Sequence, residues 1–90
     1  MNLKRKIKIR NPQGLHARPA SVFVSIANKY GSEVAVSKGR ERVNGKSIMG
    51  LLTLAASQGS TVWIETSGAD APQAMRELEA FLLNEKSDHA

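Results

Sequence analysis

Residues 11–20 read NPQGLHARPA and join a strand-like segment to a helix-like segment. Asn11, Pro12 and Gly14 favour a turn, and His16 follows where the helix should begin. Histidine is an unusual residue for that position, because Ser, Thr, Asp and Asn are better caps of a helix N-terminus. The segment therefore indicates either a plain surface histidine or an imidazole with a chemical role.

The neighbours of His16 favour a site for an anion. At a helix start the amides of Ala17 and Arg18 lack intrahelical acceptors and attract negative charge. The Arg18 guanidinium can bind two phosphate oxygens at once, and Pro19 stiffens the first turn. The local sequence holds no carboxylate beside the histidine and no glycine-rich nucleotide loop. We therefore favour a histidine that accepts and donates a phosphoryl group over a hydrolase.

The segments around the turn show the periodicities of a mixed fold. In residues 3–10, Leu3, Ile7 and Ile9 alternate with basic residues, and only Arg5 breaks the pattern. This alternation predicts a strand that is buried on one face and solvated on the other. Helical spacing of apolar residues predicts a helix over residues 17–30, with Gly31 just beyond its end. Further elements are expected as strands at residues 33–37, 41–43 and 61–66, a short helix after Ser47, and a last helix opened by Asp70.

This order, βαββαβα, predicts an α+β fold. One four-stranded antiparallel sheet with three helices on one face is the economical arrangement. We expect a hairpin turn at Lys38-Gly39 and a capping-box-like pair between Asp70 and Gln73. Residues 1–90 should form a single domain, with a frayed tail at about residues 85–90.

Ser47 marks a second candidate site. The simpler interpretation is an N-cap of the short apolar helix that follows. The functional interpretation is regulatory phosphorylation, which would place a dianion at a helix N-terminus beside Lys46. Ile48 and Met49 would then form an exposed apolar docking surface, although such residues are usually buried. The residues alone leave these alternatives open.

Composition excludes several classes of protein. The chain has no cysteine and only two histidines among 90 residues, so we expect no metal site and no disulfide. The sequence contains no apolar run long enough to cross a membrane, and we expect a cytoplasmic protein. The net charge of +5 comes from five basic residues within the first ten positions. Solubility or protection of a sheet edge explains them better than nucleic-acid binding, because few aromatic residues accompany them.

Two segments together resemble the HPr family of phosphocarrier proteins, which serve the phosphoenolpyruvate-dependent sugar phosphotransferase system. GLHARPA is similar to the active-site segment of that family, and GKSIMGLLTLAA is similar to its serine segment. The resemblance covers almost the whole chain and implies an open-faced β-sandwich with strand order 1-4-2-3. Relatives with this fold also serve nitrogen-related chains, and a regulatory relative lacks the histidine that this chain has.

The resemblance also implies roles for individual residues and partners. His16 would take a phosphoryl group on Nδ1 from phosphorylated enzyme I and pass it to an enzyme IIA domain. Arg18 would assist, while the Ala17 and Arg18 amides hold the phosphate oxygens. Ser47 would be the substrate of an HPr kinase/phosphorylase, and partners would dock on Ile48, Met49, Leu51 and Leu52. The protein would then be a monomeric carrier without cofactors, and not an enzyme.

Two other functions remain as competing hypotheses at the level of sequence. One is a regulatory binding module that is switched by phosphate on Ser47. The other is a small nucleic-acid-binding domain that uses the basic first strand, which the confinement of the charge to one segment disfavours.

Overall fold

The computed structural model describes residues 1–85 and contains four strands and three helices. The frayed tail was predicted at about residues 85–90, and residues 86–90 lie outside the described residues. The element order is the predicted one: β1 (Asn2–Lys8), α1 (Ala17–Ala27), β2 (Glu33–Lys38), β3 (Glu41–Asn44), α2 (Ile48–Thr53), β4 (Thr61–Ser67) and α3 (Ala71–Leu83).

The four strands form one antiparallel sheet in the order β1-β4-β2-β3, as expected. The long strands β1 and β4 pair from Asn2 opposite Ser67 to Lys8 opposite Thr61. This register places Ile7 beside Val62, and both are buried. The alternation in the sequence therefore fixes which face of each strand packs on the core.

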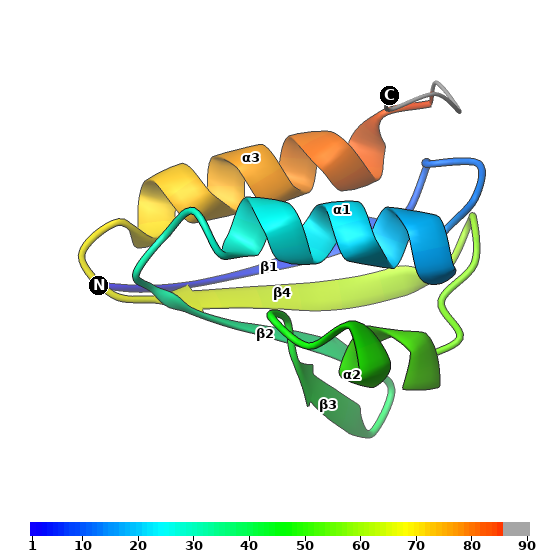
Figure 1. The fold of residues 1–90 in the computed structure, drawn as a ribbon, viewed down its shortest axis with the longest axis horizontal. Coiled ribbons are helices and arrows are strands. Elements are labelled where there is room, and N and C mark those ends of the chain that lie inside the picture. Colours follow the sequence, from blue (N-terminus) through cyan, green and yellow to red (C-terminus); the bar gives the residue numbers. More distant parts are fainter. Residues whose placement is uncertain (86–90) are drawn as a thin grey trace.

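All three helices lie on one side of the sheet (Figure 1). Helices α1 and α3 cover the long strands, whereas the short α2 lies near β3. The apolar face of α3 is buried, with Leu78 and Leu82 inaccessible to solvent. The opposite face of the sheet is open, and the fold class is the predicted open-faced sandwich. Within residues 1–85, no helix is long and apolar enough to span a bilayer.

Helix α1 is shorter than predicted, because it ends at Ala27 and not at residue 30. The amides of Lys29 and Tyr30 bond to carbonyls three residues back, which tightens the chain out of the helix. The side chains of both residues bond to Glu77 of α3. Gly31 does not adopt the left-handed conformation of a terminating glycine. Contacts with α3 thus accompany an end of α1 that local sequence did not specify.

Asp70 precedes α3 as expected, but the predicted capping-box interaction is wrong. Its side chain makes no bond to the helix it precedes. The carboxylate accepts hydrogen bonds from the Gly31 and Ser32 amides and from the Ser32 hydroxyl. The Ser32 hydroxyl, followed by the Gly31 amide, holds the pKa of Asp70 below its usual range. Asp70 therefore joins the start of α3 to the segment that enters β2.

Two smaller predictions also need adjustment. The tight turn between β2 and β3 consists of Gly39 and Arg40, with Lys38 already paired to Glu41. Arg5, the exception in the alternation of β1, forms an ion pair with Glu79 of α3. A long side chain at the sheet edge can reach a helix, so a basic residue is accommodated at a position that alternation assigns to the core.

Candidate functional site

The turn before α1 is closed by a buried asparagine. Asn11 is 1% exposed, its carbonyl accepts from the Gly14 amide, and its side-chain amide donates to the Gly14 carbonyl. Both polar ends of the turn are therefore satisfied within it. The chain leaves this turn through Leu15, which is buried and anchors the segment in the core.

Gly14 allows this turn to pack directly on the segment that follows α2. It has φ +60°, and a Cβ at this position would lie 2.6 Å from the Ala56 carbonyl oxygen and 2.7 Å from Ser57 Cα. The Leu15 amide also donates to the Ala56 carbonyl at 2.8 Å. The sequence predicted a tight bend at Gly14 but contained no signal for this neighbour.

His16 lies at the N-cap of α1 with an extended backbone, φ −77° and ψ −174°. Its carbonyl accepts the first helical bond, from Ala20, while its side chain makes no capping bond. The residue is exposed. By helix geometry the Ala17 and Arg18 amides have no intrahelical acceptor. Pro19 has no backbone N–H and therefore leaves no unpaired donor. The imidazole thus lies beside two amide donors that it does not use.

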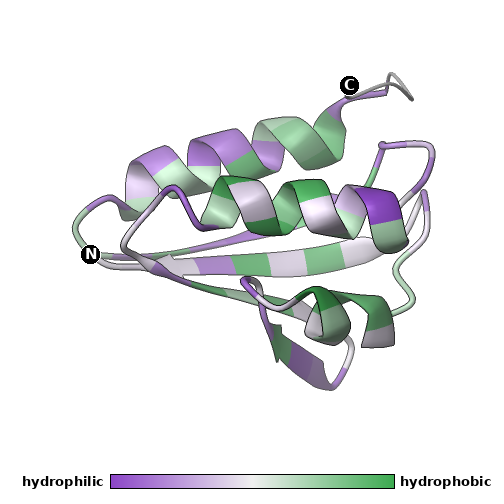
Figure 2. Ribbon diagram, in the orientation of Figure 1, coloured by the Kyte–Doolittle hydropathy of each residue, from purple (hydrophilic) through white to green (hydrophobic). Residues whose placement is uncertain are grey.

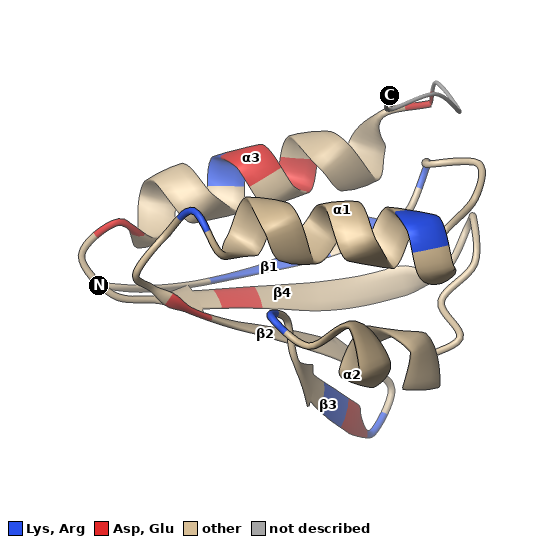
Figure 3. Cartoon of the chain, viewed as in Figure 1, with Lys and Arg blue, Asp and Glu red and all other residues tan. Residues whose placement is uncertain are grey.

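The charge around this helix start is positive. The first turn of α1 contains no acidic residue, and Figure 3 shows basic colour at the start of α1 and no acidic colour along it. Arg18 is exposed, and no ion pair formed within residues 1–85 involves it. Its guanidinium is therefore available to an incoming anion.

Ser47 is a true N-cap. It has extended backbone angles, and its hydroxyl accepts a hydrogen bond of 3.0 Å from the Gly50 amide. The Nζ of the neighbouring Lys46 donates to the Tyr30 carbonyl, three residues beyond the end of α1. The structure therefore confirms that Ser47 caps α2. This role is compatible with a later modification of the same hydroxyl.

Helix α2 exposes an apolar surface, and Figure 2 shows hydrophobic residues over most of its length. Met49 is 74% exposed, and Ile48 and Leu52 are also exposed. The placement of Leu51 on this docking surface is wrong, because it is fully buried in the core. In a short helix that lies on a sheet, position 51 faces inward with Leu54, one turn later. We call Ile48, Met49 and Leu52 the α2 surface.

The two candidate sites lie at opposite ends of α2. Ser47 caps its N-terminus, whereas the turn before His16 bonds to Ala56, just past its C-terminus. A helix of six residues is about 9 Å long. The α2 surface therefore connects the two sites, which the order of residues along the chain does not reveal.

Two residues that support this region were not anticipated. Lys38 donates from its Nζ to the Leu54 and Ala55 carbonyls, which stabilises the C-terminal end of α2. Ala55 adopts φ +48°, a left-handed conformation that residues other than glycine rarely take. An alanine gives no sequence signal for this conformation.

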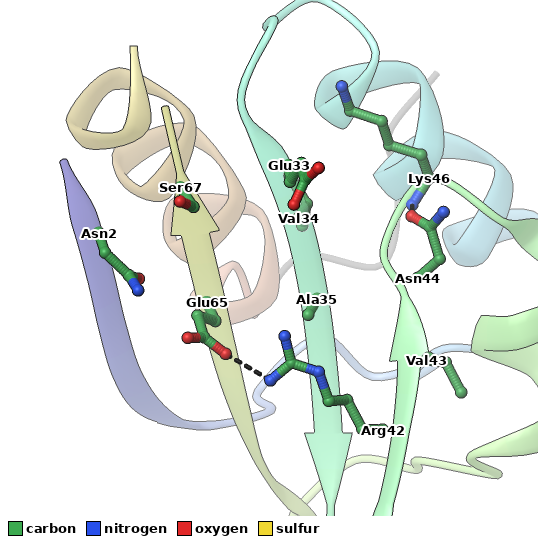
Figure 4. A pocket seen from close by; sticks show the side chains of 10 residues that line it. All are labelled: Asn2, Glu33, Val34, Ala35, Arg42, Val43, Asn44, Lys46, Glu65 and Ser67. Atoms are coloured by element: carbon green, nitrogen blue, oxygen red, sulfur yellow. Dashed lines mark hydrogen bonds and ion pairs between the residues drawn. The ribbon is translucent and has the colours of Figure 1, made fainter. Parts of the chain in front are cut away.

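A hollow on the open face of the sheet has Lys46, the neighbour of Ser47, at its margin. Figure 4 shows Arg42 and Glu65 pointing toward each other there, and they form an ion pair. Hydrogen bonding to Arg42 holds the pKa of Glu65 below its usual range. The residues that line the hollow include neither His16 nor Ser47. Residues 1–85 also contain no cluster of side chains that could hold a metal ion.

Known proteins resemble the chain over most of its length. A family model described as "PTS HPr component phosphorylation site" matches residues 3–84. The phosphocarrier protein HPr of Neisseria meningitidis serogroup A is 53% identical over 76 residues, 84% of this chain and 85% of that protein. The HPr-like protein Crh of Bacillus subtilis is 41% identical over 83 residues, 92% and 98% of the two chains. A crystal structure of HPr from Thermoanaerobacter tengcongensis has a TM-score of 0.89 at 38% identity, covering 98% and 99%.

These matches agree with the geometry of the molecule. The fold and the site define a class of small open-faced β-sandwich proteins with an exposed histidine at the start of the first helix. The chain belongs to the HPr family, the phosphocarrier proteins of the phosphotransferase system.

Proposed function

We propose that this protein carries a phosphoryl group on Nδ1 of His16, taken from phosphorylated enzyme I and delivered to an enzyme IIA domain in sugar uptake. The observation that supports this most directly is an exposed imidazole that leaves the first helical amides unused. An ordinary capping side chain would occupy those donors itself. Here they remain available for the oxygens of the group that the imidazole receives.

In the transfer step, the bond from phosphorus to the donor breaks as the bond from phosphorus to Nδ1 forms. The amides of Ala17 and Arg18 then hold phosphate oxygens at the positive end of α1. The Arg18 guanidinium offsets the negative charge of the bound phosphoryl group. These groups do not act as a base that activates water, so the phosphoryl group stays on the imidazole until a partner accepts it.

The α2 surface is the proposed docking site for both partners. It is apolar and adjoins the turn before His16 through Ala56. A partner seated on Ile48, Met49 and Leu52 would bring its own phosphoryl site toward the imidazole. We propose Ser47 as the regulatory site of an HPr kinase/phosphorylase, since a phosphate there adds charge at the edge of the same surface.

The test uses purified enzyme I, phosphoenolpyruvate and an enzyme IIA domain. Wild-type protein should become phosphorylated and should lose the label when the IIA domain is added. His16→Ala should not be labelled, and Arg18→Ala should be labelled slowly while its circular dichroism is unchanged. Equal rates for wild type and Arg18→Ala in both transfers would contradict the role of the guanidinium.

A regulatory function at Ser47 has a separate readout. Incubation with ATP and the kinase should give an acid-stable phosphate that is absent from Ser47→Ala. Protein phosphorylated in this way should accept phosphate from enzyme I more slowly, whereas the Ser47→Ala variant should remain unaffected by the kinase.

A further inference from the structure

The open face of the sheet carries lysines that the phosphocarrier function does not use. Lys4, Lys6 and Lys8 alternate along β1 and are all exposed. No ion pair within the described chain, residues 1–85, involves them. Alternate residues of a strand are about 7 Å apart, so the three ammonium groups follow one edge of the sheet as a row.

The chain's single tryptophan lies beside this row. Trp63 of β4 is paired with Lys6, and the residue is 41% exposed although it is in a central strand. The Lys4 ammonium lies 5.3 Å from the ring centroid. We call Lys4, Lys6, Lys8 and Trp63 the lysine–tryptophan face.

Acidic residues of the open face are gathered in the hollow. Glu33 and Glu65 line that hollow together with Arg42 (Figure 4), and Arg42 pairs with Glu65. Lys6 and Lys8 are instead paired across the strand with Trp63 and Thr61, neither of which is charged. Lys4 stands opposite Glu65 and helps to lower the pKa of that carboxylate, so Lys6 and Lys8 are the lysines of this face that have no acidic residue opposite them in the strand register.

We propose that the lysine–tryptophan face adsorbs to the surface of a bilayer rich in anionic phospholipid. Lysine ammonium groups near such a surface are attracted to its headgroups, and tryptophan is favoured at the boundary between headgroups and acyl chains. The lysine stems can lie along apolar surface while their charges stay in water. Adsorption through the open face leaves α1, α2 and the His16 site on the opposite side of the sheet.

The geometry favours a bilayer over a nucleic acid. Proteins that bind single strands stack successive bases on several aromatic rings, and this face offers one. A duplex groove admits a helix or a two-stranded ribbon, whereas this face belongs to a four-stranded sheet. A row of charges around one interfacial ring matches a flat anionic surface.

The experiment follows the fluorescence of full-length protein with vesicles, since Trp63 is the only tryptophan in the chain. At low salt, phosphatidylglycerol vesicles should shift the emission to the blue, and brominated acyl chains should quench it. Phosphatidylcholine vesicles should do neither. Lys6→Gln/Lys8→Gln should weaken partitioning, measured by sedimentation, roughly 25-fold, because each lysine contributes about five-fold.

The matched control removes two cations from the helical side of the molecule. Lys29→Gln/Arg76→Gln has the same net charge as the β1 double variant and should partition nearly as well as wild type. Equal losses in the two variants would overturn the proposal, because net charge alone would explain binding. Absence of binding to phosphatidylglycerol at low salt would also overturn it, as would tighter, lysine-dependent binding to polyuridylate than to vesicles.

Discussion

The packing of the histidine turn against the segment after α2 can be tested with Gly14→Ala. The new Cβ would lie 2.6 Å from the Ala56 carbonyl oxygen and 2.7 Å from Ser57 Cα, both backbone atoms. Such overpacking costs about 1–3 kcal/mol, and the left-handed φ of +60° adds about 1 kcal/mol. A loss of about 2–4 kcal/mol should lower the melting temperature of a domain of this size by about 10–20 °C.

Gly39→Ala is the matched control. Gly39 has the same φ of +60°, but a Cβ there would meet nothing within 4 Å. Both variants restrict the unfolded chain equally, so the difference between them isolates the contact with Ala56 and Ser57. Thermal and urea denaturation followed by circular dichroism should show a fall of only about 5 °C for Gly39→Ala. If Gly14→Ala melts at the same temperature as Gly39→Ala, the account of how the turn is held is wrong.

Three further predictions concern other residues. Ser47→Ala should lose about 1 kcal/mol in urea denaturation, because the Gly50 amide loses its acceptor; unchanged stability would argue against the cap. The depressed pKa of Asp70 means that its contribution is present above the unfolded pKa, about 3.9, and is lost on acidification. The stability gap between wild type and Asp70→Asn should therefore narrow from about pH 5 to about pH 2, and a constant gap would refute this. Met49→Ser, on the α2 surface, should raise about ten-fold the KM that enzyme I shows for this protein as acceptor, without changing the melting temperature. An unchanged KM would remove Met49 from the docking site.

Where the sequence has a strong periodic pattern, it predicted correctly the type of element and which side chains are buried. Alternation in β1 identified Ile7 as buried, because a strand has two faces and only one packs on the core. The order of elements followed from such patterns. The strand order came from the family resemblance and agrees with the structure.

Errors arose where tertiary contacts outweighed local preference. Asp70 was expected to cap α3, yet three donors from Gly31 and Ser32 bind its carboxylate. Leu51 was assigned to the docking surface from the family resemblance. The sequence itself gave no correction, because a helix of six residues is too short for periodicity to separate inward from outward positions.

The candidate site was only partly accessible to sequence reasoning. His16 stood out because histidine is an unusual N-cap, and Arg18 stood out because its guanidinium can bind phosphate oxygens beside it. The contact of Gly14 with Ser57, the left-handed Ala55 and the capping by Lys38 depend on segments that meet only after folding. Trp63 was expected on a strand, but its place beside Lys4 on the open face required the register between β1 and β4.

The central claim is that His16 itself carries the phosphoryl group, and the chemistry of the phosphorylated protein tests it most directly. After reaction with phosphoenolpyruvate and enzyme I, wild type should contain a phosphate that is lost in acid and stable in base, and NMR should place it on Nδ1 of His16. A phosphate that survives acid, or labelling that persists in His16→Ala, would contradict the account.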